Sequence, residues 1–323
     1  MKVLVLGGAG FVGREVIRSL QQQEHILPIV ASRRPSAEAG VETVAIDALD
    51  QDHLTSAVAD VDALINCITG DGKTIEQSTR TIASAVEASD RCNKLIHMST
   101  MSVYGSQEGT VNEDSKMVAD NGWYCAAKVA AEGILRERFQ QGLYILRPGC
   151  VYGPESHLWS LRIARLLASG RLGDLAEQGD GWSNLVHVKD VADAAVQCLQ
   201  LETSDRVRTF NIVAPDSPRW NSYFRDLALG INAVPLRYLT SRRIALEGKV
   251  IAPPLKVIER LCNKFRIDTK NLPDGMAPSL FRLWQQQILL DSTAATRELG
   301  IQWVTYQEGL EESCNHISKV LQP

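Results

Sequence analysis

The chain has little cysteine chemistry, no long hydrophobic run and little net charge. Its seven cysteines are scattered and none forms a Cys-x-x-Cys pair, so we expect neither a metal site nor a disulfide framework. No apolar run approaches the length of a membrane helix, which argues against contact with a membrane. The net charge of −4 argues against a general nucleic-acid binder. No internal repeat or low-complexity tract interrupts the chain.

Length and composition are those of an ordinary globular protein. The chain has 323 residues, of which 45% are apolar and 22% are charged, which is enough for one large or two modest domains. Scattered thiols are most simply explained as reduced cysteines. The first residues are predicted to be a core strand, so we expect no signal peptide and a cytoplasmic location.

The N-terminus has the pattern of a strand, a glycine turn and a helix. Lys2–Leu6 is a short apolar run, and Phe11–Leu20 carries an apolar stripe with helical spacing. The spaced glycines between them permit a tight turn, the approach of a pyrophosphate and close packing of the helix on the strand. The free N–H groups of the helix N-terminus attract phosphate. We predict a dinucleotide-binding turn rather than a flexible glycine loop. The predicted cofactor contacts are Gly7, Gly10, Phe11, Val12 and Gly13.

The end of the second predicted strand, Ile26–Ala31, indicates which dinucleotide binds. Pro28 weakens the strand prediction locally. An acidic residue after this strand would bind the ribose 2′-hydroxyl of NAD, but the sequence has Ser32, Arg33 and Arg34. Guanidinium groups bind phosphate oxygens in pairs, which favours the 2′-phosphate of NADP. We predict NADP(H), with NAD as the alternative cofactor and a solvated basic turn as the alternative explanation.

Tyr124 and Lys128 suggest an acid/base group. Residues four apart share a helix face, where an ammonium can lower the pKa of a phenol from about 10 toward neutrality. Thr100 can hold a carbonyl or alcohol oxygen against the phenol, which then gives or takes the proton. By itself such a pair more often marks an ordinary amphipathic helix. Together with the glycine turn, it predicts a catalytic site.

Short apolar strands alternate with helices, which predicts an α/β fold with a Rossmann-type doubly wound parallel sheet. Beyond about residue 216 the pattern changes to helices broken by prolines, which predicts a smaller, mostly helical C-terminal substrate-binding domain. We place the NADP-binding domain at residues 1–155 and 179–215, and the substrate-binding lid at 156–178 and 216–323. Further strands are expected near 41–46, 62–67, 94–98, 143–147 and 210–213, and helices near 50–59, 75–89, 124–140 and 190–201, the last with Asp190 as N-cap.

Six motifs, taken in order, resemble those of the extended short-chain dehydrogenases/reductases, which include NAD(P)-dependent epimerases and dehydratases. The resemblance covers essentially the whole chain. The motifs are Gly7–Gly13, Asp47–Asp50, Thr100 with Val103–Gly105, Tyr124 with Lys128, Arg147–Pro154 and His187–Ala192.

The resemblance implies roles for particular residues. Thr100, Tyr124 and Lys128 match the family's catalytic triad, and Lys128 also matches the lysine that binds the nicotinamide ribose. The resemblance also implies a small-molecule substrate and a homodimer formed through the helix that carries Tyr124. The other implied cofactor contacts are Asp47 with Ala48 at the adenine, Asn66, Cys67, Ile68 and Thr69 along the nucleotide groove, and Pro148 and Val151 near the nicotinamide.

Two departures from the family's sugar-nucleotide epimerases bear on the reaction. Cys150 replaces an Asn that usually helps bind the nucleotide diphosphate, and Gly181–Asn184 lacks the usual Arg. NADP is an exchangeable cofactor, which a net reductase requires and a redox-neutral epimerase does not. We therefore predict an NADP(H)-dependent oxidoreductase that transfers hydride between nicotinamide and a ketone or secondary alcohol, with Tyr124 as acid/base. The alternatives are a nucleotide-sugar epimerase or dehydratase, and a non-catalytic NADP-binding regulator.

The departures at Cys150 and at Ser183 with Asn184, together with an apolar, aromatic C-terminal region, indicate a small or medium organic carbonyl or alcohol as the substrate. The aromatic residues of this region are candidates for lining an apolar pocket, or else for the core of the smaller domain. Several arginines offer an alternative set of cations for a diphosphate. The apolar candidates are Trp220, Tyr223, Phe224, Phe281, Leu283 and Trp284, and the arginines are Arg162, Arg165, Arg219 and Arg225.

Overall fold

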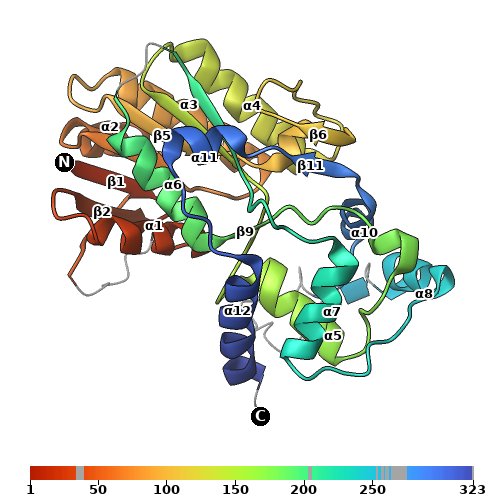
Figure 1. Ribbon diagram of the computed structural model, residues 1–323. Helices are drawn as coiled ribbons and strands as arrows, with labels where there is room; N and C mark the ends of the chain where they lie inside the picture. The colour runs from red at the N-terminus through yellow and green to blue at the C-terminus, as the bar shows by residue number, and fades with distance from the viewer. Residues whose placement is uncertain are drawn as a thin grey trace. The chain divides into compact units, whose positions relative to one another are not determined.

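The computed structural model describes residues 1–33, 40–202, 206–251, 254, 255, 258, 262 and 275–321 (Figure 1). The chain divides into two compact units. The first unit comprises Met1–Val151, Val186–Pro215 and Leu290–Val304, and the second comprises Tyr152–Leu185, Asp216–Leu289 and Thr305–Pro323. Leu290–Val304 therefore belongs with the first unit, although the sequence pattern grouped it with the lid. That the second unit binds substrate stays a prediction.

A seven-stranded parallel sheet forms the centre of the first unit, which confirms the Rossmann-type prediction. Its strand order is β10-β7-β5-β4-β1-β2-β3, so the order reverses on either side of β1, as in other doubly wound sheets. The strands are β1 (Lys2–Leu6), β2 (Leu27–Ser32), β3 (Glu42–Ala45), β4 (Ala63–Asn66), β5 (Lys94–Met98), β7 (Leu143–Pro148) and β10 (Arg208–Ile212).

Helices cover both faces of this sheet (Figure 1). Alternate residues of β1 point to opposite faces: Val3 and Val5 join one apolar cluster, and Leu4 and Leu6 join the other. The first cluster includes residues of α1, α6 and α11, and the second includes residues of α2, α3 and α4. The helices are α1 (Phe11–Gln21), α2 (Gln51–Ala59), α3 (Gly72–Glu87), α4 (Trp123–Arg138), α6 (Val188–Gln200) and α11 (Thr293–Leu299).

Pro28 lies within β2 at a position where its missing N–H group is not needed. The N–H of Leu27 donates to the carbonyl of Met1 in the neighbouring chain segment, so the next peptide nitrogen faces the β3 side. Pairing of β2 with β3 begins only at Ile29. The proline therefore costs the sheet no ladder hydrogen bond.

The start of α6 differs from the prediction. His187, at the end of β9 (Leu185–His187), is the N-cap, and the helix begins at Val188. Asp190 lies in the first turn, and its buried carboxylate accepts the N–H of Val304 at 3.0 Å. The chain passes directly from strand into helix, which moves the cap to the last strand residue.

The second unit is mostly helical, and its aromatic side chains form its core. Trp220, Tyr223, Phe224 and Trp284 are fully buried and contact one another, for example with 5.2 Å between the ring centroids of Phe224 and Trp284. Of the two alternatives for these four side chains, a pocket lining or the core of the smaller domain, the structure supports the core. Large aromatics at helical spacing bury the most apolar area against each other. The elements of this unit are η2 (His157–Leu161), α5 (Arg162–Ala168), η3 (Ala176–Gly179), α7 (Trp220–Gly230), α8 (Ser241–Leu246), η4 (Glu247–Ile251), α10 (Pro278–Gln285) and α12 (Tyr306–Leu321).

Four short strands form two further two-stranded sheets, in which β6 pairs with β11 and β8 pairs with β9, and one short helix follows β5. None of the helices in the described part of the chain is both long and apolar enough to cross a bilayer. The remaining elements are η1 (Met101–Tyr104), β6 (Gly109–Val111), β8 (Cys150–Tyr152) and β11 (Ile288–Leu290).

Candidate active site

The glycine turn between β1 and α1 has the geometry that the sequence predicts. Gly7 has a φ of +75°, and a Cβ atom there would lie 3.0 Å from the backbone of Cys67 at the end of β4. A Cβ at Gly13 would lie 2.2 Å from the carbonyl oxygen of Gly7, so the helix can approach the turn this closely only with glycine. Gly10 is exposed and is the N-cap of α1, where it contributes no side chain to the first N–H groups. The turn therefore leaves these donors available to an anion, near Phe11 and Val12.

The end of β2 presents basic rather than acidic chemistry. Ser32 is the last strand residue and Arg33 is exposed, whereas Arg34 lies outside the described residues. The N–H of Ile46 donates to the carbonyl of Ser32, which brings the start of the Asp47 segment beside it. Asp47 is exposed, its carboxylate accepts the N–H of Leu49, and the neighbouring Ala48 is buried.

The end of β4 lies beside the glycine turn, with the backbone of Cys67 against Gly7. Asn66 is buried, and its amide oxygen accepts the N–H of Ile68 while its nitrogen contacts Nδ1 of His97 at 3.0 Å. Its side chain thus fixes the strand end rather than facing solvent. Burial raises the pKa of the Cys67 thiol to about 12, against the opposing charge of Lys128, so Cys67 is a neutral thiol close to that lysine.

The three predicted catalytic residues meet at the carboxyl edge of the sheet. Thr100 follows β5, and Tyr124 and Lys128 lie one turn apart on α4. The Tyr124 hydroxyl lies close enough to the side chains of Thr100 and Thr69 for both to act against the rise in its pKa. The buried Lys128 Nζ donates to the carbonyl of Met98 at 2.7 Å. One strand end and one helix thus hold a phenol, a hydroxyl and an ammonium together.

Burial changes the pKa of Tyr124 more than its polar partners do. It raises the pKa of Tyr124, and the side chains of Thr100 and Thr69 only oppose the rise. The direction is opposite to the lowered pKa that the sequence predicts for Tyr124. Burial also lowers the pKa of Lys128 to about 8, so its charge is itself partly lost at mildly alkaline pH. Burial favours the neutral form of both groups.

The end of β7 and the start of β8 complete this edge of the sheet. Pro148 is buried and pairs with Ile212 of β10, and Val151 is half-buried against the apolar cluster. Cys150 is buried, and its burial raises the pKa of the thiol, so this position is neutral and apolar. A neutral thiol is a poor ligand for a diphosphate.

The segment Gly181–Asn184, which lacks the arginine usual in sugar-nucleotide epimerases, forms hydrogen bonds within the second unit. Ser183 is buried, and its hydroxyl donates to the carbonyl of Pro218 at 2.5 Å. The buried Asn184 amide donates to the carbonyl of Ile288 at 2.9 Å. Nearby, the Arg219 guanidinium stacks over Trp182, 4.4 Å from its ring centroid. Ser183 and Asn184 are uncharged, so neither can replace an arginine as a partner for a diphosphate.

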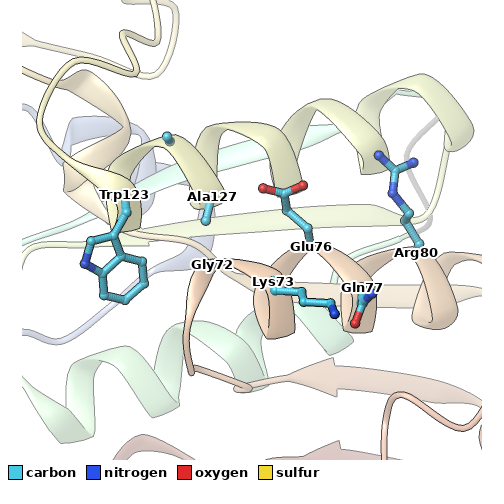
Figure 2. Close-up of a pocket in the computed structure, with 8 residues that line it drawn as sticks. Gly72, Lys73, Glu76, Gln77, Arg80, Trp123 and Ala127 are labelled. Atoms are coloured by element: carbon cyan, nitrogen blue, oxygen red, sulfur yellow. The ribbon is translucent and has the colours of Figure 1, made fainter.

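A hollow of about 520 Å³ lies between α3 and α4 and contains none of the predicted site residues (Figure 2). Trp123, which is 62% exposed, stands at one end, and Lys73, Glu76 and Arg80 of α3 line the rest. Among the described residues, no group of three His, Cys, Asp or Glu side chains is placed to hold a metal ion.

Reasoning from sequence missed a buried polar group directly behind the triad. Glu132, one turn after Lys128 on α4, forms a two-pronged ion pair with Arg147 of β7 and accepts a hydrogen bond from Ser99. The available signal was the helical spacing of Tyr124, Lys128 and Glu132, which places an acidic residue on the same face as the catalytic pair.

A doubly wound sheet with a glycine turn at its first strand–helix connection is typical of dinucleotide-binding domains. The chain belongs to the NAD dependent epimerase/dehydratase family, whose model matches residues 3–213.

Relatives of known sequence and structure support this placement. The chain is 25% identical to Protein YeeZ of Escherichia coli strain K12, over 87% of this chain and 100% of that protein. It is 26% identical to a dTDP-4-dehydro-6-deoxy-D-allose reductase of Streptomyces sp., over 61% of this chain and 72% of the reductase. Its fold is similar to that of the UDP-glucuronic acid 4-epimerase of Bacillus cereus in complex with UDP-glucuronic acid and NAD, with a TM-score of 0.73, 18% identity and coverage of 99% and 100% of the two chains.

Proposed function

We propose that the protein is a net oxidoreductase that transfers hydride between a nicotinamide and a ketone or secondary alcohol. The observation that carries the proposal is the arrangement of the Tyr124 hydroxyl with Thr100, one helical turn from the buried Lys128. The cofactor supplies or accepts the hydride when bound. The protein must then place the substrate oxygen and move one proton.

Each residue of the triad has a separate task in this proposal. Thr100 donates a hydrogen bond that holds the substrate oxygen against the phenol. Tyr124 gives its proton to that oxygen during reduction and takes it back during oxidation. Lys128 binds the nicotinamide ribose, and its ammonium, together with the positive oxidised ring, offsets the burial that raises the pKa of Tyr124.

The acid/base proposal predicts the effect of Tyr124→Phe. Loss of the phenol should lower turnover by about 10² or more, because no group then supplies the proton, while cofactor still binds. Thr100→Ala should cost less, because only an orienting hydrogen bond is lost. Oxidation of NADPH with a panel of ketones, alongside calorimetric titration of the cofactor, measures both effects. Near-normal turnover of Tyr124→Phe would show that the proton comes from elsewhere.

We further propose NADP(H) as the cofactor. Ser32 and Arg33 stand at the end of β2, where an NAD-binding chain would place an acidic side chain. A charge-assisted bond from the exposed Arg33 to the 2′-phosphate is the interaction that discriminates. The similar epimerase structure contains NAD, so the two cofactors need a direct comparison.

Arg33→Ala tests the cofactor assignment. Loss of one charge-assisted bond, worth about 1.5–3 kcal/mol, should weaken NADPH binding by roughly one to two orders of magnitude. NADH binding should hardly change. Arg18→Ala removes another exposed arginine of the same unit and serves as the control. Equal affinity of the wild type for NADH and NADPH in calorimetry would contradict the assignment.

A nucleotide-sugar epimerase or dehydratase is the second candidate. It is favoured by the similar epimerase fold and by a relative named for a dTDP-sugar. Against it stand the apolar Cys150 and the internal hydrogen bonds of the uncharged Ser183 and Asn184; the cation beside that segment is Arg219, which stacks on Trp182. We therefore propose a small or medium organic carbonyl or alcohol as substrate.

A thermal-shift screen with NADP present separates these two substrate classes. It compares nucleotide sugars with hydrophobic ketones. Stabilisation by a ketone that is then reduced supports a net reductase. Strong stabilisation by a UDP- or dTDP-sugar, followed by epimerisation without net consumption of NADPH, would establish the second candidate instead.

We also propose that the protein forms a homodimer through α3 and α4. The support is the exposed Trp123 beside a hollow with charges of both signs, in Lys73, Glu76 and Arg80 (Figure 2). An aromatic side chain in this setting is typical of interface centres.

A further inference from the structure

We propose that Glu132, Arg147 and Ser99 are positioning residues, which fix the helix that carries Tyr124 and Lys128 against the strand end that carries Thr100. The proposal rests on the acid/base role assigned to Tyr124 above. None of the three touches the reacting atoms. They act through the placement of the residues that do.

The ion pair between Glu132 and Arg147 is fully enclosed. The side chain of Glu132 is 0% exposed and that of Arg147 is 2% exposed. Arg147 Nε lies 3.0 Å from one carboxylate oxygen and Nη2 lies 2.7 Å from the other, which is the two-pronged geometry with the most directional constraint. Helix α4 is thereby locked to β7 in both position and rotation.

Ser99 extends this lock to the residue that orients the substrate. Its hydroxyl donates to Glu132 Oε1 at 2.5 Å, and it directly precedes Thr100. On the other side, Arg147 Nη1 donates to the Tyr104 hydroxyl at 3.0 Å, and Tyr104 ends the short helix that Thr100 caps. Ser99, directly before Thr100, is thus bound to the Glu132 carboxylate, and Tyr104, four residues after Thr100, is connected to the same carboxylate through Arg147.

The Tyr104 hydroxyl continues the connection across the sheet. It donates to the side chain of Asn211 on β10 at 2.6 Å. Asn211 in turn donates from its amide to the carbonyl of Asp291 at 3.1 Å. The network therefore runs from α4 through β7 to β10, so several hydrogen bonds together hold α4 against the sheet.

Stability alone gives little reason for such a buried pair. Desolvation of two charges cancels most of their attraction, and apolar residues of similar volume often serve stability equally well. Orientation is the advantage that an apolar pair lacks. Glu132 also lies close enough to Lys128 for its carboxylate to favour the charged form of that lysine. Both effects converge on the catalytic face of α4.

Ser99→Ala is the least disruptive test, because it removes one hydroxyl and leaves the ion pair intact. Ser99→Thr restores a hydroxyl and serves as the rescue. Glu132→Gln keeps the side-chain volume and removes the charge. The matched control is Glu87→Gln, which breaks a two-pronged ion pair between Glu87 of α3 and Arg138 of α4 that is partly exposed at the surface.

Two readouts distinguish positioning from a structural role. We expect Ser99→Ala and Glu132→Gln to lower kcat on the best ketone substrate by roughly 10- to 100-fold, with KM and cofactor affinity nearly unchanged. We also expect the pKa of Tyr124 to rise by about half a pH unit as its interaction with Thr100 weakens. The phenolate absorbance of each variant, minus that of the same variant with Tyr124→Phe, gives this pKa without any substrate. Ser99→Thr should recover most of both effects, and Glu87→Gln should show neither.

The outcomes separate this proposal from the proposed function. If no ketone or alcohol is turned over, the proposed function fails, and the Tyr124 titration still decides the positioning role. If Glu132→Gln does not fold, Ser99→Ala carries the test. Variants that unfold at lower temperature but keep the wild-type kcat and the wild-type Tyr124 pKa would overturn the proposal.

Discussion

Single residues of the first unit show how strongly burial controls charge. It lowers the pKa of Lys128 to about 8 and raises that of Asp190 to about 7, in each case toward the neutral form. Arg147 is equally buried but keeps its charge. Burial lowers the pKa of Arg147, but the Glu132 carboxylate and Tyr104 raise it by more, so the pKa lies above its ordinary value. A buried charge therefore persists in this unit where a partner of opposite charge is in direct contact.

Asp190 gives a pH-dependent prediction. Its pKa is about 7 in the folded chain and near 3.8 when unfolded, mainly because of burial and with a further rise from Asp193. The folded state thus binds more protons between about pH 4 and pH 7, so its stability contribution is complete below that window and is lost as pH rises through it. Asp190→Asn never ionises and retains an oxygen for the N–H of Val304. It should be more stable than the wild type by about 2–4 kcal/mol at pH 8, and by much less at pH 5.

Urea unfolding at several pH values measures this difference. The exposed Asp52→Asn provides a control for the removal of one carboxylate. A stability difference between Asp190→Asn and wild type that stays constant from pH 5 to pH 8 would be incompatible with the burial argument. Lys189, whose positive charge opposes the rise in the pKa of Asp190, is unchanged in every comparison.

At the scale of elements, the β1–α1 turn separates a folding role from a binding role. A Cβ at Gly13 would overlap the backbone of Gly7 and Gly8, at 2.2 Å and 2.7 Å, whereas a Cβ at Gly10 meets only the Gly7 carbonyl oxygen at 3.2 Å. Gly13→Ala should therefore push α1 off the sheet and destabilise the protein by several kcal/mol, about 3 or more. Gly10→Ala should fold with nearly normal stability but lose cofactor affinity, because its methyl group occupies the approach to the helix N-terminus.

Thermal unfolding and cofactor titration distinguish the two glycine variants. Gly40→Ala provides a glycine substitution with open space around it, although at a positive φ that carries its own small cost. Tight cofactor binding by Gly10→Ala would show that the pyrophosphate does not bind at this turn. A stable Gly13→Ala would mean that the helix can shift without loss of packing.

Elements with strong local patterns could be predicted, and those that depend on tertiary partners could not. Lys94–Met98 is a strand with the predicted bounds, because its short stretch of mainly apolar residues (Leu95, Ile96 and Met98) lies between two predicted helices. The role of Asp190 depends on Val304, which lies far along the chain and gives no local signal. The aromatics of α7 and α10 have the same sequence pattern in a core as in a pocket wall. Glu132 was visible only as an acidic residue at helical spacing, since its partner Arg147 belongs to a distant strand.

For the whole molecule, the predicted functions fall in different units: cofactor binding and proton transfer in the first, substrate binding in the second. The first holds the glycine turn, the triad and the positioning network, so everything proposed for proton transfer lies within one unit. The second has its own aromatic core and is assigned the substrate only by prediction. This arrangement lets variants of the triad be tested for cofactor binding independently of substrate choice.

The homodimer is the prediction that belongs to this scale. A two-fold interface uses the same surface twice, so the hollow between α3 and α4 would bring Lys73, Glu76 and Arg80 of both copies, charges of both signs, to one interface (Figure 2). Trp123, at 62% exposure, would supply the apolar anchor, and the loss of such an anchor typically costs about 2 kcal/mol or more. Trp123→Glu should therefore convert a dimer into a monomer in sedimentation velocity.

Leu229→Glu is the matched control for this test, because Leu229 is exposed to the same degree, at 61%, but lies on α7 of the second unit. It should leave the dimer intact. A wild-type protein that sediments as a monomer, or a Trp123→Glu variant that remains dimeric, would remove this face as the interface. Because Trp123 directly precedes Tyr124, a dimer that forms here would also hold the first turn of the catalytic helix. Trp123→Glu should then lower turnover in parallel with dissociation, and the activity should recover as protein concentration restores the dimer.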